Sequence, residues 1–327
     1  MGLRGALALI VLAALSPAQE PFRVDVHLVN VAFAVRDSQG LLAGNLTADD
    51  FQVFDDGVPQ KIAFFARSSD LPLSLGLIVD MSGSQEKFVK DHRRDLEKFL
   101  KHTLTGRDRA FLVCFGNHIR LVSDFTDSPE SLTDALHDYE KGKVRDFTKI
   151  GGVEGHSDGR ARGFTELGPP EHRVLGTAFY DAIVEPIAER LKADEHGSRA
   201  LIVFSDGEDN SSAHNMLDAI EAAQAADVRV FAIRYTELDR HGALNARNKY
   251  GISVMARIAR ETGGADFDAR EKDLASHFKE IGDDLRNSYQ LAYHASNVDG
   301  DKSFHKIVIR SKRSDVTVRA KTGYFAR

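Results

Sequence analysis

The segment Leu73-Ser-Leu-Gly-Leu-Ile-Val-Asp80-Met-Ser82-Gly-Ser84 is an apolar run that ends in one acid and two hydroxyls. A continuous Leu/Ile/Val run is typical of a central strand in a parallel sheet, which helices cover on both faces. Such sheets bind ligands beyond the carboxyl ends of their strands, and oxygen is the ligand that a hard cation such as Mg²⁺ prefers. Asp80, Ser82 and Ser84 are therefore a candidate metal site. Capping of a helix that begins at Gln85 is the alternative role of the serines.

The sequence around this segment alternates apolar runs with stretches of helical periodicity. We expect strands at residues 73–79, 110–115, 200–204, 228–233 and 265–267. We expect helices at residues 85–103, 129–141, 177–193, 213–226, 253–262 and 272–287. Pro186 should kink or divide the third helix. This alternation predicts an α/β fold with a doubly wound, mostly parallel, Rossmann-like sheet.

Both ends of the chain have shorter, β-like patterns. Residues 22–68 include a helical turn capped by Thr47 and a hairpin closed by Asp55-Asp56-Gly57. Residues 288–327 contain further strand patterns and a turn at 297–301. Because neither segment is large enough to bury its own core, we predict that they pair into one small β-sandwich with the α/β domain of residues 73–287 inserted between them. Two separate additions to the edges of the central sheet are the alternative.

Three loops of the expected α/β domain resemble the metal-ion-dependent adhesion site (MIDAS) of the von Willebrand factor type A (VWFA) domain. Residues 80–84 are similar to its Asp-x-Ser-x-Ser loop, residues 176–183 to the segment that supplies a threonine, and residues 204–207 to the loop that supplies a second aspartate. The loops follow the order of the family, and the resemblance covers residues 73–287. By resemblance, the metal residues are the following: Asp80, Ser82, Ser84, Thr177 and Asp206.

This resemblance implies bound Mg²⁺, with Mn²⁺ or Ca²⁺ as alternatives. The three hydroxyls would be direct or switchable ligands, and Asp80 and Asp206 would act partly through water. Two carboxylates balance a dication without saturating its coordination, so a position stays open to an outside oxygen. In the family a partner's acidic side chain often completes the coordination, which implies a protein ligand that presents a carboxylate. Glu208 and Asp209 are expected to be solvated or to support the ligands.

The N-terminus and the flanking segments indicate a location. Residues 1–18 have the charged, apolar and small-residue order of a secretory signal peptide, with a membrane anchor as the alternative. The motifs at 46–51, 55–57 and 322–325 resemble a bacterial family of secreted proteins with a VWFA-related domain. We therefore expect a secreted or periplasmic protein without an integral membrane segment after signal removal. A net charge of −6 does not favour nucleic acid as a partner. The single cysteine, Cys114, should be buried in a strand.

Two kinds of enzyme compete with a binding function. Residues 84–87, 205–207 and 321–323 fit or half-fit the three motifs of serine acyl enzymes in the right order. A metal-assisted hydrolase would need a general base, for which His214 is nearest in sequence to the loops. The other histidines are expected to be solvated.

The stretch 142–176 is rich in glycine and charge and has no clear periodicity. A loop of this length has either a functional role, here as a lid or specificity element, or is disordered. Taken together, the sequence predicts a secreted, non-enzymatic module for metal-dependent protein interaction or adhesion. A structural or assembly subunit, in which the metal only stabilises the loops, is the alternative.

Overall fold

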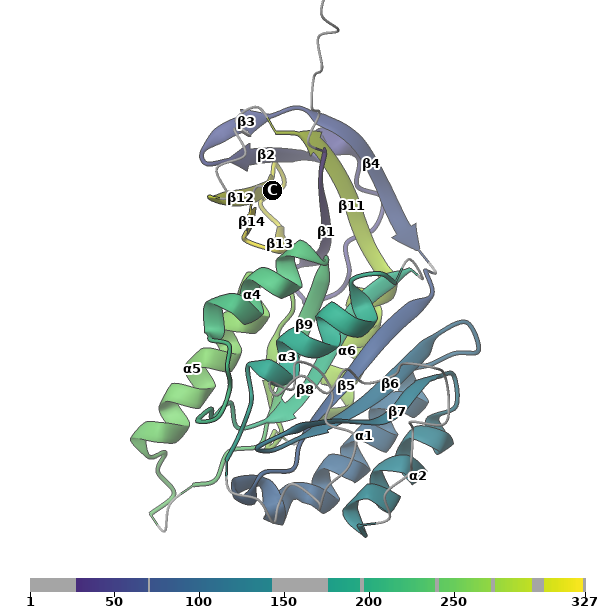
Figure 1. The fold of residues 1–327 in the computed structure, drawn as a ribbon. Coiled ribbons are helices and arrows are strands. Elements are labelled where there is room, and N and C mark those ends of the chain that lie inside the picture. The colour runs from purple at the N-terminus through teal and green to yellow at the C-terminus, as the bar shows by residue number, and fades with distance from the viewer. Residues whose placement is uncertain are drawn as a thin grey trace, which may run out of the picture.

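The computed structural model describes residues 28–69, 71–142, 176–194, 197–238, 241–271, 274–295 and 303–325. The expected signal peptide, residues 143–175 and the expected turn at 297–301 lie outside the described residues. The described chain forms an α/β unit and a β-sandwich that lies against one end of it (Figure 1).

A six-stranded sheet forms the centre of the α/β unit, in the order β10-β9-β8-β5-β6-β7. The strands are β5 (Leu73–Asp80), β6 (Arg109–Phe115), β7 (Ile119–Thr126), β8 (Ser198–Ser205), β9 (Val228–Arg234) and β10 (Asp266–Asp268). Neighbouring strands pair in parallel except β6 and β7, which are antiparallel. Strand β5 is buried along its whole length, because both faces of the sheet are covered. The doubly wound, mostly parallel sheet predicted from the sequence is confirmed.

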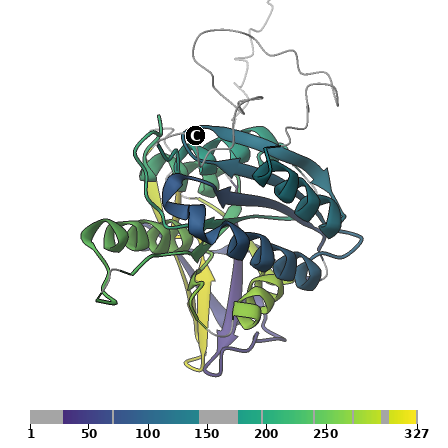
Figure 2. The same cartoon turned by 90° about the horizontal axis from the view of Figure 1, so that it is seen from below.

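Helices pack on both faces of this sheet (Figure 2). One face carries α1 (Val89–Thr103), α2 (Pro129–Glu140) and α6 (Leu274–Arg286), and a 3₁₀ segment, η2 (Gly83–Phe88), leads into α1. The other face carries α3 (Asp181–Pro186), the π-helical turn η5 (Ile187–Leu191), α4 (Met216–Ala225) and α5 (Ala246–Glu261). The change from α- to π-helix at Pro186 is the predicted break, because proline cannot donate the next helical hydrogen bond.

The β-sandwich consists of two four-stranded sheets, β13-β1-β11-β4 and β14-β12-β2-β3. The first half of the chain supplies β1 (Leu28–Asp37), the turn η1 (Ala48–Asp50), β2 (Phe51–Asp55), β3 (Val58–Gln60) and β4 (Ile62–Ser69). The C-terminal part supplies β11 (Asn287–His294), β12 (Phe304–Ser311), β13 (Val316–Ala320) and β14 (Gly323–Phe325). Phe33, Phe51 and Tyr289 meet in the core between the sheets. The predicted sandwich of N- and C-terminal segments is thus confirmed.

Strands β4 and β11 explain how one unit is inserted in the other. They pair antiparallel, with Ser69 opposite Asn287, so the chain leaves and re-enters the sandwich at neighbouring positions. A buried ionic cluster reinforces this junction. Arg36 of β1 and Arg319 of β13 donate to the carboxylate of Asp284 on α6 at 2.5 and 2.7 Å. Burial raises the pKa of Asp284 and the arginines oppose this rise, so the cluster fixes the two units to each other.

The largest differences from the sequence-based expectation are strand β7 and the start of helix α5. Strand β7 was not expected, and it pairs antiparallel at the edge of the sheet through an irregular register. Helix α5 begins at Ala246, earlier than residue 253, because the side chain of Asn245 caps it by accepting a hydrogen bond from Asn248 N. Cys114 is buried in β6 as expected. Within the described residues, every helix is too short or too polar to cross a bilayer.

Candidate metal centre

The carboxyl edge of the central sheet brings two of the expected metal residues together. Strands β5 and β8 are parallel neighbours in which Val79 lies opposite Phe204, so Asp80 and the Ser205-Asp206 pair leave the sheet side by side. Asp80 and Asp206 are both buried. The hydroxyl of Ser205 donates to Asp80 Oδ2 at 2.6 Å, which fixes the first carboxylate from the neighbouring strand.

The loop after β5 turns both serine hydroxyls toward one point. Ser82 N donates to Asp80 Oδ1 at 2.9 Å, and Ser82 Oγ lies 3.2 Å from Ser84 Oγ. Ser82 occupies the N-cap position of η2, but its hydroxyl makes no capping hydrogen bond. The alternative role as a side-chain cap is therefore wrong for Ser82. Its hydroxyl is buried beside the Asp80 carboxylate in an arrangement suited to a shared ligand.

The loop after β8 holds Asp206 in a fixed position. Gln85 Nε2 donates to Asp206 Oδ2 at 2.7 Å and to Tyr235 O at 3.2 Å, while Glu208 N donates to Asp206 Oδ1 at 3.1 Å. Gly207 has φ +77°, and a Cβ on it would lie 2.5 Å from the carbonyl oxygen of Gly251 on α5. Only glycine combines this backbone conformation with so close an approach.

Thr177 reaches the edge through its backbone. Its N–H donates to Asn210 Oδ1 at 2.8 Å, and its carbonyl accepts from Asn210 N at 3.0 Å. Asp209 Oδ1 accepts from Phe179 N at 2.9 Å, so Asp209 ties this segment to the Asp206 loop rather than being solvated. Thr177 is buried, and within the described chain its hydroxyl has no hydrogen bond to the other four candidate residues. The structure thus brings the Thr177 segment to the edge, but among the described residues the Thr177 hydroxyl is not hydrogen-bonded to the other candidate ligands.

The two buried aspartates, Asp80 and Asp206, hold negative charge, and in the described chain the cation Arg247 pairs with the neighbouring Glu208 rather than with either of them. Burial, and then the neighbouring charge of Asp206, raise the pKa of Asp80 to about 7, although hydrogen bonds from Ser205 and Ser82 oppose this. Burial and Asp206 also raise the pKa of Glu208. Neither Asp80 nor Asp206 forms an ion pair with a residue in the described ranges. Two buried carboxylates surrounded by hydroxyl oxygens fit a divalent cation, because such a charge would offset their repulsion.

Three residues near the site were not expected from the sequence. Ser205 and Gln85 hold the two carboxylates, as described above. His92 of α1 is fully buried, with its ring edge-on to Tyr235 at 4.3 Å, and burial lowers its pKa to about 3. The expectation that the histidines other than His214 are solvated is therefore wrong for His92, and it is also wrong for His305 on β12, which is buried as well. The sequence did contain a sign that His92 is buried. It lies four residues before Leu96 and seven before Phe99, and residues at this spacing share one helix face.

The residues of the two rival enzyme interpretations do not come together in one site. Lys321 is buried in a hydrogen-bonded ion pair with Asp227, which directly precedes β9 at the opposite end of the sheet from Ser84. His214 lies before α4 and shares a 2.8 Å hydrogen bond between its Nδ1 and Asp181 Oδ1. The geometry of a serine acyl enzyme is thus not formed by these motifs.

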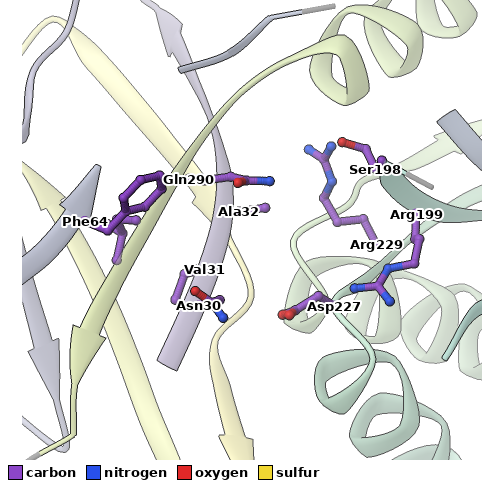
Figure 3. A pocket seen from close by; sticks show the side chains of 11 residues that line it. Asn30, Val31, Ala32, Phe64, Ser198, Arg199, Asp227, Arg229 and Gln290 are labelled. Atoms are coloured by element: carbon purple, nitrogen blue, oxygen red, sulfur yellow. The ribbon is translucent and has the colours of Figure 1, made fainter. Parts of the chain in front are cut away.

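A cavity of about 300 Å³ lies at the junction of the two units, at the amino ends of β8 and β9. Figure 3 shows Asn30 and Gln290 of the sandwich on one side, and Arg199 and Arg229 of the α/β unit on the other. Arg229 Nη1 donates to the carbonyl of Asp284 at 2.9 Å. This cavity belongs to the junction and is separate from the carboxyl edge.

No family model matches the chain, and no curated protein matches it. Several solved structures are similar. A von Willebrand factor type A protein from Catenulispora acidiphila is 13% identical with a TM-score of 0.43, over 93% of this chain and 74% of that one. The manganese-loaded TRAP protein of Plasmodium vivax is 13% identical with a TM-score of 0.43, over 79% and 96%. An aerotolerance-related membrane protein from Bacteroides fragilis is 16% identical with a TM-score of 0.44, over 65% and 98%.

At these identities and scores the similarities carry no inference about activity or ligands. The architecture itself agrees with the resemblance found in the sequence, since the parallel sheet has helices on both faces and the three loops gather at its carboxyl edge. The α/β unit of this chain has a VWFA-like fold.

Proposed function

We propose that this protein binds a divalent cation, Mg²⁺ in the first instance, at the carboxyl edge and uses it to recognise a carboxylate on a protein partner. The metal residues would be the following: Asp80, Ser82, Ser84, Thr177 and Asp206. The observation that carries this proposal is the buried pair Asp80 and Asp206, which lacks a cationic partner in the described chain and in which the pKa of Asp80 is raised to about 7.

The chemistry of the donors favours a cation that stays open to an outside ligand. All five side chains offer oxygen, which suits Mg²⁺ and also Mn²⁺ or Ca²⁺. Hydroxyls are neutral and the two carboxylates together balance a dication. Mg²⁺ commonly keeps several waters, and a carboxylate from outside would replace one of them with a charged oxygen.

An exposed aromatic ring beside the edge supports a protein as the partner. Tyr250 on α5 is 61% exposed, and it directly precedes Gly251, whose backbone packs against Asp206 and Gly207. Tyrosine is among the residues that most often dominate protein interfaces. A partner that offers a carboxylate to the metal would meet this ring at the same face.

A binding function fits the side chains at the carboxyl edge better than a hydrolase does, because the candidate catalytic groups there are already paired. His214, the nearest candidate base, is held by Asp181, and Lys87 is paired with Glu237. The signal-like residues 1–18 support secretion or periplasmic location. The second candidate function is a structural subunit, in which the same cation only fixes the loops.

Manganese provides a direct test, because bound Mn²⁺ with exchangeable water relaxes solvent protons. The Mn²⁺-loaded chain would be titrated with a short peptide that contains aspartate, and with the same peptide carrying asparagine. Metal-dependent recognition predicts that only the aspartate peptide lowers the relaxation, by displacing water, and that Thr177→Ala weakens this effect while the fold is kept. Bound Mn²⁺ whose relaxation neither peptide changes would favour the structural subunit.

A further inference from the structure

A second group of ligand atoms lies in the β-sandwich, far from the carboxyl edge in the fold. Asp55 ends β2, Asp56 forms the following turn and His305 lies on β12. His305 Nδ1 is 3.5 Å from Asp55 Oδ1 and 3.0 Å from Asp56 Oδ2, and one atom of each residue lies within 4.8 Å of the other two. The group joins the N-terminal hairpin to the C-terminal strand.

One carboxylate oxygen of this group is buried without a hydrogen-bond partner in the described chain. Asp55 is 6% exposed. Its Oδ2 accepts hydrogen bonds from Tyr293 Oη at 3.0 Å and from Tyr324 Oη at 2.9 Å, whereas its Oδ1 has no hydrogen-bond partner in the described chain. The two tyrosines fix the orientation of the carboxylate. A buried carboxylate oxygen without a hydrogen-bond partner is costly, and a cation bound to Oδ1 would offset this cost.

The surroundings of His305 orient its ring toward the same point. Its Nε2 lies 3.2 Å from Ser303 Oγ, and its ring stacks on Tyr324 with the centroids 5.1 Å apart. If Nε2 carries the proton and donates it to Ser303, the lone pair of Nδ1 faces Asp55 and Asp56. Ligating histidines are oriented in this way by a hydrogen bond from their other nitrogen.

The two separations from His305 Nδ1 suit a small tetrahedral ion. Ligands about 2.0 Å from a tetrahedral Zn²⁺ lie about 3.3 Å from one another. The two separations from His305 Nδ1, 3.0 and 3.5 Å, bracket this value. One nitrogen and two carboxylate oxygens are donors that Zn²⁺ and similar transition ions accept, while Mg²⁺ favours oxygen alone. The Asp56 side chain is 48% exposed, so the group is open to solvent.

We infer that Asp55 Oδ1, Asp56 Oδ2 and His305 Nδ1 form a second metal site, which binds Zn²⁺ or a similar transition ion with an outside ligand in the fourth position. The bound ion stabilises the sandwich, because its ligands come from the two segments that build it. This inference is independent of the proposed Mg²⁺ site, since the two share no residue.

The test uses the full chain after treatment with a chelator. Zn²⁺ binding is measured by calorimetry, and Co²⁺ serves as a spectroscopic probe, because tetrahedral Co²⁺ absorbs strongly in the visible range. His305→Gln removes the nitrogen ligand. Asp56→Asn removes one charge but keeps the acceptor for Lys306 N, which now bonds Asp56 Oδ1 at 2.9 Å, and asparagine tolerates the φ of +49° at this position.

Two further variants serve as controls. His277→Gln removes an imidazole that also lies beside a carboxylate, Glu271 at 2.6 Å, and Asp206→Ala disables the other site. We expect tetrahedral Co²⁺ absorption in the wild type, in His277→Gln and in Asp206→Ala. In Asp206→Ala, which isolates this group, we expect one bound Zn²⁺ per chain. In His305→Gln and Asp56→Asn we expect Zn²⁺ affinity to fall by about 100-fold or more, above the range for loss of a supporting hydrogen bond.

Folded wild type that binds no Zn²⁺, or binding that His305→Gln and Asp56→Asn leave unchanged, would overturn the inference. In the first case His305 and the two aspartates are only in contact with one another and hold no metal. If His305→Gln does not fold, Asp56→Asn decides, because this side chain is half exposed and its turn is preserved.

Discussion

Ser205 donates a 2.6 Å hydrogen bond to Asp80 Oδ2, and thereby links the ends of the two central parallel strands. The same Ser205 Oγ accepts from Gly207 N at 3.0 Å, so one hydroxyl aligns the first carboxylate with the backbone of the second loop. The geometry of the edge is therefore set within the sheet itself. The position of the expected ligands thus depends on residues, such as Ser205, that are not themselves expected to bind the metal.

Ser205→Ala should destabilise the protein by about 1–3 kcal/mol, because Asp80 Oδ2 and Gly207 N both lose a buried partner. The free energy of unfolding in urea measures this. Ser253→Ala is the matched control, since it removes an exposed hydroxyl bonded to Tyr250 O and should change stability by less than about 0.5 kcal/mol. Equal losses in the two variants would contradict the role of Ser205.

Stability without metal should fall as pH rises from about 4 to about 7. The pKa of Asp80 is raised from 3.8 to about 7 in the folded state, so over this window the folded state binds more protons than the unfolded state and ionisation opposes folding. The slope from this group is up to about 1.4 kcal/mol per pH unit. Urea unfolding at a series of pH values should give a flatter profile for Asp80→Asn. Parallel profiles for both proteins would exclude Asp80 as the titrating group.

Gly207→Ala should be more harmful than Gly242→Ala, although the two glycines have φ of +77° and +75°. Alanine in this conformation costs about 1–2 kcal/mol at either position. At Gly207 the added Cβ would also lie 2.5 Å from Gly251 O, whereas nothing lies within 4 Å at Gly242. Overpacking should add about 1–3 kcal/mol and weaken metal binding. Thermal unfolding and calorimetry measure both effects, and similar results for the two variants would mean that α5 moves away freely.

Asp284→Asn should destabilise the protein by about 3 kcal/mol, the low end for breaking a buried ion pair, because Arg319 is partly exposed. The variant leaves Arg36 and Arg319 at the junction with a neutral partner. Asp283→Asn is the control, since its exposed pair with Lys279 contributes about 0.5 kcal/mol or less. Denaturant unfolding compares them. A loss no larger than that of Asp283→Asn would show that the junction does not depend on the cluster.

Buried strands and loop order could be predicted from the sequence because each leaves a local pattern. Strands β5, β6, β8 and β9 all contain apolar runs, and Asp80 and Asp206 lie at the carboxyl ends of two of them. The pairing of the terminal segments was inferred from their small size, and the sheets confirm it. The side-chain geometry at Thr177 and the identity of the metal remain predictions.

Other features depend on neighbours that a sequence does not reveal. Strand β7 lies at an edge, and its irregular register and polar residues, such as Arg120 and Asp124, hide the alternation. The start of α5 carries exposed side chains such as Tyr250, so no apolar stripe marks it. The group of Asp55, Asp56 and His305 forms only when β2 and β12 pair, which no short-range spacing indicates.

Thermal unfolding with and without Mg²⁺ or Mn²⁺, in the wild type and in Asp206→Ala, tests the central claim most directly. A cation that binds only the folded state at about 100 times its Kd should stabilise the wild type by about 2.7 kcal/mol. We predict that the wild type gains this stability and that Asp206→Ala does not. Equal behaviour of the two proteins, with no heat of binding in calorimetry, would contradict a metal site at the carboxyl edge.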